Sequence, residues 1–109
     1  MAKKMSASFP ALTIESTSFN GDPDHVHQNT AVNGKGDEFL NTVNFFLKQG
    51  TTETNLNQPT TAIQMSGMAS TWAQSLSINP ATFPASSYQF IARGDNGGSA
   101  AVDIVLVDS

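Results

Sequence analysis

The stretch SSYQFIARGDNGGSAAVDIVLV, residues 86–107, decides the fold of this chain. Two runs of alternating apolar residues flank a glycine-rich segment that contains the pair Asn96-Gly97. An Asn-Gly pair between such runs is the strongest short-range signal for a β-hairpin, because both residues tolerate the positive φ angles of tight turns. We therefore predict a hairpin with one apolar face, formed by Tyr88, Phe90, Ala92, Val102, Ile104 and Leu106.

Short strands in the rest of the chain are expected to cover this apolar face. Turn residues between them predict turns at 18–24 and 33–37, a loop at 49–59 and a corner loop at 79–84. About seven strands with frequent turns in roughly 100 residues are typical of an all-β, Greek-key β-sandwich. The additional strands are expected at residues 12–15, 26–32, 39–48, 60–65 and 70–78.

Two of these strands carry distinctive apolar residues. Residues 39–48 read FLNTVNFFLK, so a strand there places Phe45 and Phe46 on opposite faces. We expect this strand to be central, with Phe46 free to meet a partner on the second face. The strand at 70–78 is expected to turn Trp72 inward together with Leu76 and Ile78, and the strand at 60–65 to turn Ile63 and Met65 inward.

Tyr88 is the single tyrosine, and it opens the last strand but one after a corner loop. This is the position of a tyrosine corner, in which the hydroxyl bonds back to the backbone of the preceding loop. An ordinary half-buried tyrosine is the alternative interpretation. Residues 33–107 resemble the immunoglobulin-like (Ig-like) modules of bacteria and phages, without the usual cysteine pair. The resemblance implies a role as an adhesin, an accessory sugar-binding domain or a capsid decoration protein.

The composition excludes several classes of protein. The chain has 109 residues, which suits one domain, and its charged fraction of 13% is about half the usual value. Only five Lys and Arg residues and a net charge of −4 argue against nucleic-acid binding. No apolar run is long enough to span a bilayer, and no secretory signal is recognised. Without cysteine there is no disulfide, thiolate zinc site or thiol nucleophile.

The N-terminal residues 1–10 are interpreted as an extended arm ahead of a domain at 11–109, because Pro10 keeps Phe9 out of helical dihedrals. An arm that docks on a neighbouring subunit and a merely frayed terminus are the two interpretations. As partner-binding residues we name Lys3, Lys4, Met5, Phe9 and Phe46.

Three motifs suggest chemistry but also have structural explanations. His25 and His27 would share one face of a strand near Asp22 and Asp24, as in a metal site, or they simply form a polar edge. The tripeptide at 93–95 (RGD) resembles integrin-binding loops, yet Gly and Asp are ordinary turn residues. The aromatic residues Trp72, Phe83 and Tyr88 could stack on a sugar, although the core is the better place for Trp72.

Catalysis is not expected, because no carboxylate pair, nucleophile–histidine pair or phosphate-binding loop is recognised. Asp37, Glu38 and Glu53 lie in or beside predicted loops, and Asp103 on the outer face of the last strand. We expect a structural protein without a cofactor. It would decorate a bacteriophage capsid as a cement protein, bound to the major capsid protein or to copies of itself, and would be made in the host cytoplasm and carried in the virion. The alternative is an extracellular or cell-surface adhesin or carbohydrate-binding module of a larger secreted protein.

Overall fold

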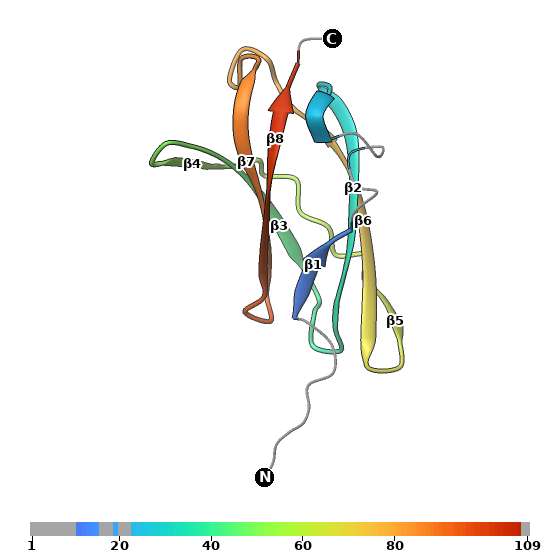
Figure 1. Ribbon diagram of the computed structural model, residues 1–109. Coiled ribbons are helices and arrows are strands. Elements are labelled where there is room, and N and C mark those ends of the chain that lie inside the picture. The colour runs from blue at the N-terminus through green and yellow to red at the C-terminus, as the bar shows by residue number, and fades with distance from the viewer. Residues whose placement is uncertain (1–10, 16–18, 20–22, 108–109) are drawn as a thin grey trace.

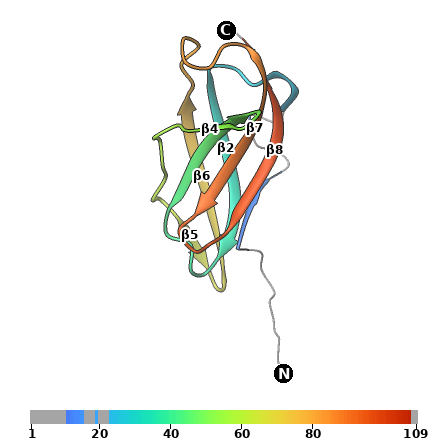
Figure 2. The same cartoon turned by 90° about the vertical axis from the view of Figure 1, so that its left-hand side faces the viewer.

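The computed structural model describes residues 11–15, 19 and 23–107. It consists of two four-stranded sheets that face each other, with strand orders β1-β2-β6-β5 and β4-β3-β7-β8 (Figures 1 and 2). All strand pairs are antiparallel. The prediction of an all-β, two-layer fold is confirmed, with eight strands in the described part of the chain. The elements are β1 (Leu12–Ile14), η3 (Pro23–His25), β2 (Asn29–Asp37), β3 (Val43–Gln49), β4 (Thr52–Asn55), β5 (Gln64–Ser66), β6 (Ala69–Ser77), β7 (Ser86–Gly94) and β8 (Ser99–Leu106).

The predicted C-terminal hairpin is confirmed as β7 and β8, which pair from Arg93–Ser99 to Ser86–Leu106. Gly97 adopts a φ of 87° in the connecting loop, a value that favours glycine. The Gly94 N–H closes this loop by donating to the Gly98 carbonyl at 2.9 Å.

The core lies between the two sheets and is rich in aromatic rings. Phe45 and Phe90 are fully buried, and their rings stack with centroids 5.7 Å apart. Trp72 packs against Phe45 from the opposite sheet at 5.5 Å. Phe19, in a left-handed conformation with a φ of 58°, meets Phe90 edge-on at 4.8 Å. The predicted inward faces of β6, β7 and β8 and the expected core role of Trp72 are therefore confirmed.

The prediction for residues 39–48 is confirmed in part. β3 is an interior strand, with Phe45 buried and Phe46 on the other face. The strand begins only at Val43, because residues 38–42 form a loop in which Leu40 turns into the core and Phe39 into solvent.

The predicted turn at 33–37 is wrong, because these residues form the second half of the nine-residue strand β2. Gly34 and Gly36 serve close packing here. A Cβ on Gly34 would lie 2.4 Å from the Trp72 ring and 2.0 Å from the Thr13 carbonyl. The glycines at 34 and 36 are therefore needed because a side chain would not fit beside the neighbouring groups. In a turn, glycines are needed for a different reason, their conformational freedom.

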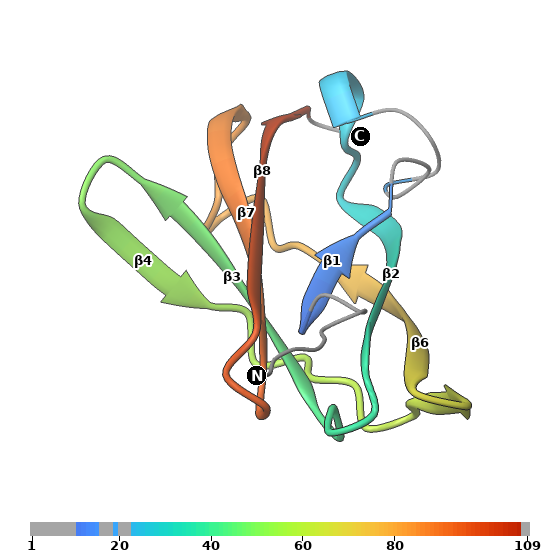
Figure 3. The same cartoon turned by 60° about the horizontal axis from the view of Figure 1, so that its bottom comes forward.

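The predicted loop at 49–59 is also partly wrong, because Thr52–Asn55 form β4 and pair with β3. The two strands are joined by Gly50 and Thr51, and Gly50 has a φ of 63°, as at the first central position of a type II′ turn. β4 stands away from the opposite sheet (Figure 3). It therefore lacks the apolar alternation that marks a strand over a core.

Two further strand assignments need correction. The expected strand at 26–32 begins only at Asn29, and Val26 forms an isolated parallel bridge with Leu106. The strand expected at 60–65 is the short β5, preceded by a bridge between Thr60 and Val43. Ile63 packs against the core as expected, but Met65 is 50% exposed because β5 is an edge strand.

The chain crosses between the sheets after β4, and a side chain anchors the crossing. The Gln58 amide accepts a hydrogen bond from Ser77 N at 2.9 Å and donates to Ser77 O at 2.8 Å. Gln58 thus satisfies the backbone of β6 where β5 no longer covers it.

Tyr88 donates its hydroxyl proton to the Pro84 carbonyl at 2.6 Å, in the loop that precedes β7. The hydroxyl–backbone bond predicted for a tyrosine corner is therefore present. Burial of the ring raises the pKa of Tyr88.

The described chain enters and leaves at opposite ends of the sandwich. Ala11 lies at the end that carries the β7–β8 loop, where its carbonyl accepts a hydrogen bond from the Asn96 side-chain amide at 2.9 Å. Val107 follows β8 at the other end and donates to the Val26 carbonyl at 2.9 Å (Figure 1).

Candidate partner-binding surfaces

The outer face of the sheet β4-β3-β7-β8 carries the side chains that alternate with the core residues. The strand register places Phe46, Ile91 and Ala101 side by side in one row across three strands. Lys48, Gln89 and Asp103 form the next row. The face therefore combines an apolar row with a charged row, and we call it the outer face below.

Phe46 lies half-buried on this face beneath a charged clamp. The Arg93 guanidinium lies 4.7 Å from the centre of the Phe46 ring, a cation–π geometry. Its two terminal nitrogens bind both carboxylate oxygens of Glu53 on β4, at 2.6 and 2.7 Å. This hydrogen bond lowers the pKa of Glu53 and raises the pKa of Arg93.

Ile91 points to the outer face and does not belong to the core that lies between the sheets, yet it is only 5% exposed. It is the cross-strand neighbour of Phe46 and of Ala101. Phe46 and its clamp therefore belong to a small packed cluster outside the main core.

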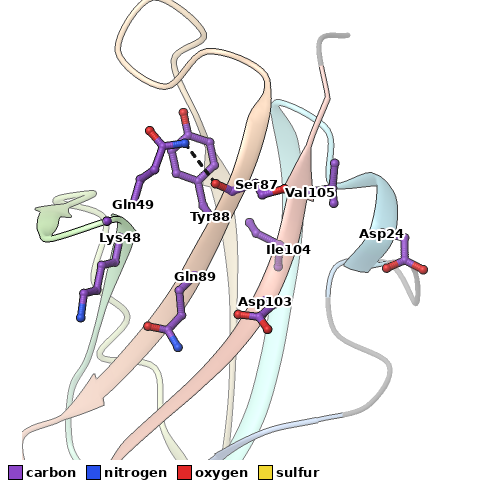
Figure 4. A pocket seen from close by; sticks show the side chains of 10 residues that line it. Asp24, Lys48, Gln49, Ser87, Tyr88, Gln89, Asp103, Ile104 and Val105 are labelled. Atoms are coloured by element: carbon purple, nitrogen blue, oxygen red, sulfur yellow. Dashed lines mark hydrogen bonds between the residues drawn. The ribbon is translucent and has the colours of Figure 1, made fainter.

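A shallow depression of about 560 Å³ lies over the charged row. Lys48, Gln89 and Asp103 line it, and Asp24 of η3 borders it on the far side (Figure 4). Charges of both signs border the depression, as in a polar recognition surface.

A second surface lies at the end of the sandwich that carries the β2–β3 loop and the β5–β6 turn. Phe39 is 67% exposed, Met68 57% and Met65 50%. Asp37 at the end of β2 pairs with Ala69 at the start of β6. Phe39 follows Asp37 by two residues and Met68 directly precedes Ala69, so this pairing brings the β2–β3 loop and the β5–β6 turn together. We call Phe39, Met65 and Met68 the apolar end. Phe39 and Met68 could not be recognised as exposed from the sequence, because an apolar residue in the core and one on the surface look the same there.

The loops at the apolar end are held by hydrogen bonds that acidic side chains accept. Asp95 accepts from the backbone of Asn41 at 2.8 Å and of Thr42 at 3.1 Å, and these bonds lower its pKa. Asp37 accepts from the Phe39 backbone at 2.9 Å and from the Asn96 side chain at 2.8 Å. Phe39 is therefore presented on a preformed loop with acidic neighbours.

The tripeptide at 93–95 is engaged within the fold. Arg93 clamps Phe46 and Glu53, and Asp95 caps the β2–β3 loop. Both charged side chains of Arg93-Gly94-Asp95 therefore have structural roles within the fold.

The histidines do not share a strand face as the metal interpretation requires. His25 ends η3, whereas His27 lies between the bridge at Val26 and β2, and both are exposed. In the described part of the chain, no three His, Cys, Asp or Glu side chains gather as metal ligands do. Asp22 lies outside the described residues.

Of the three aromatic residues considered for sugar stacking, only Phe83 and Tyr88 lie together, and Trp72 lies apart from them. Trp72 is 3% exposed in the core and cannot stack on a ligand. Phe83 and Tyr88 meet edge-on at 6.1 Å beside a groove of about 210 Å³ under the β3–β4 hairpin. Thr52 and Thr54 also line this groove.

The arm residues Lys3, Lys4, Met5 and Phe9 lie outside the described residues. In the described ranges, no helix is long and apolar enough to cross a membrane. No protein-family model, no curated protein and no solved structure matches this chain.

Proposed function

We propose that the protein is a non-catalytic structural protein with an Ig-like Greek-key topology. The strand orders β1-β2-β6-β5 and β4-β3-β7-β8 support the topology, since the first, second, fifth and fourth strands of Ig domains share one sheet. That correspondence treats β4 as the additional strand beside β3, as in variable-type domains. The bond from Tyr88 to Pro84 is a second supporting feature.

Its proposed role is that of a capsid decoration (cement) protein of a bacteriophage, located in the virion. It docks on the major capsid protein, or on copies of itself, through the N-terminal arm, the edge strands and the outer face. Lattices repeat one contact many times, so that weak individual contacts add up to firm attachment.

The observation that carries this proposal is the clamped aromatic ring on the outer face. Phe46 is held by Arg93, and Arg93 by a bidentate bond to Glu53, so little side-chain freedom remains to be lost on binding. Aromatic and arginine side chains in fixed positions are the commonest energetic centres of protein interfaces.

Sedimentation with virus particles from the cells that carry the gene tests the role. The full chain should co-sediment with the particles, and Phe46→Ala should weaken the binding about tenfold or more. Thr71→Ala, an exposed change on the opposite sheet, is the matched control. Loss of residues 1–9 should also weaken binding, and unchanged binding would remove the arm from the mechanism. A chain that never sediments with particles would refute the role.

The alternative role is that of an adhesin or carbohydrate-binding module at the cell surface or outside the cell. The groove beside Phe83 favours it, because an aromatic residue and the two threonines Thr52 and Thr54 line it together. Glycan-array binding that is lost in Phe83→Ala but kept in Phe46→Ala would select this role over the capsid role.

A further inference from the structure

We propose that the apolar end binds residues 1–10 of a second copy of this chain, which links copies in series. The inference deepens the proposed function and rests on it for the role of the arm. Its starting point is the exposure of Phe39, Met65 and Met68 at the same end of the sandwich, since exposed apolar side chains grouped on a protein surface mark contact sites.

The apolar end is built in advance of binding. The Phe39 backbone is fixed from both sides, because its N–H donates to Asp37 and its carbonyl accepts from the Asn41 side chain at 3.1 Å. Leu40 anchors the same loop in the core. A partner therefore meets a loop whose backbone is already in position, and binding orders little of the chain.

The charge of this end selects the partner. Asp37, Glu38 and Asp95 surround Phe39 in sequence and space, so two identical ends brought face to face would repel each other. The fitting partner combines apolar and basic side chains. Lys35 and Arg93 are already paired with Glu15 and Glu53.

Residues 1–10 combine the required side chains in one segment, MAKKMSASFP. Lys3 and Lys4 supply the positive charge, and Met5 and Phe9 supply the apolar contacts. Met5, Ala7 and Phe9 alternate with two serines, so an extended segment presents these three side chains on one face.

Chain geometry favours binding of residues 1–10 to the apolar end of a neighbouring copy over binding to the apolar end of the same copy. Pro10 disfavours a helical turn at Phe9, and residues 1–9 contain no Gly, Pro, Asn or Asp, four of the five commonest turn residues. An extended chain advances about 3.3 Å per residue, so Met5 can reach about 20 Å from Ala11. Because each copy offers one arm and one apolar end, the contact continues from copy to copy or closes into a ring.

Disulfide trapping tests the contact in the full chain, which contains no cysteine of its own. We would mix two single-cysteine variants, Ser8→Cys and Ser66→Cys, under mild oxidation, with one of them isotope-labelled. The mixed disulfide should form about tenfold more than in a control mixture of Ser8→Cys with Ala81→Cys, an exposed position at the opposite end. Equal yields in the two mixtures would overturn the proposal.

The double variant Ser8→Cys/Ser66→Cys separates contacts within one copy from contacts between copies. Covalent oligomers on a non-reducing gel support the proposal, and a monomer with an internal disulfide overturns it. The variant Phe39→Ser/Met68→Ser should weaken self-association about tenfold in sedimentation velocity while the circular-dichroism spectrum stays unchanged.

The same experiments distinguish this proposal from the proposed function. Binding to particles without self-association would refute the arm contact alone. Self-association without binding to particles would refute the capsid role alone.

Discussion

Gly34 lies in the middle of β2, where its missing side chain makes room for an indole. Trp72 is its direct cross-strand neighbour, and the indole N–H donates to the Lys35 carbonyl at 3.3 Å. A single residue without a side chain thus determines how the one tryptophan of the chain enters the core.

Gly34→Ala should destabilise the protein by about 3 kcal/mol, because the new methyl group would collide with the Thr13 backbone as well as with the Trp72 ring. Urea unfolding measures the loss. Gly67→Ala is the control. It has open space around it but a positive φ, and should cost only about 1–2 kcal/mol. Equal losses in the two variants would contradict the role assigned to Gly34.

Tyr88→Phe should lower the free energy of unfolding by about 1 kcal/mol, because the Pro84 carbonyl loses its hydroxyl partner while the ring stays in place. Chemical denaturation of both proteins measures the difference. An unchanged midpoint would show that water replaces the hydroxyl without loss.

At the scale of the elements, the β7–β8 loop and the β2–β3 loop are joined through one carboxylate. Asp95 must be ionised to accept both backbone bonds at full strength, and its pKa in the folded protein is lowered. Because the pKa of Asp95 is lower in the folded than in the unfolded chain, its ionised form stabilises the fold at pH values above the unfolded pKa. This contribution is lost as the pH falls through the pKa of Asp95 in the folded protein.

The wild-type protein should therefore be more stable than Asp95→Asn at pH 7, and the difference should shrink below about pH 4. Thermal unfolding of both proteins over a pH series measures it. Asp103→Asn is the control, because Asp103 lies exposed on the outer face. A constant difference between wild type and Asp95→Asn at all pH values would show that the ionised form is not what holds the loops.

Strands over the core could be predicted from the sequence, whereas β4, which lies outside it, could not. Phe45, Trp72 and Phe90 lie in alternating runs that signal burial on one side, so β3, β6 and β7 were found. β4 has polar residues on both faces because it stands away from the opposite sheet, so alternation carries no signal there. Gly34 illustrates the other limit, since a glycine required for packing and one required for a turn are identical in sequence.

The candidate surfaces were predictable to a smaller extent. Phe46 could be identified as the residue opposite Phe45 in an interior strand, and alternation alone was sufficient for that. The clamp by Arg93 and Glu53 depends on the register of three strands, and the apolar end on the pairing of Asp37 with Ala69. Those relations arise only when distant segments come together.

For the whole molecule, both sheets contribute to one core, so they should unfold together. Trp72 is the only tryptophan and touches Phe45 across the sheets, so its fluorescence reports how the layers pack. Urea transitions followed by this fluorescence and by far-ultraviolet circular dichroism should coincide. A fluorescence midpoint at lower urea would mean that the sheets separate before their strands do.

The positions of Ala11 and Val107 at opposite ends of the sandwich have a practical consequence. A passenger protein fused behind Val107 starts on the far side from Phe39 and Met68, so the length of the sandwich separates it from a docked apolar end. Copies attached by that end would hold their cargo outward at even spacing, as a display scaffold requires.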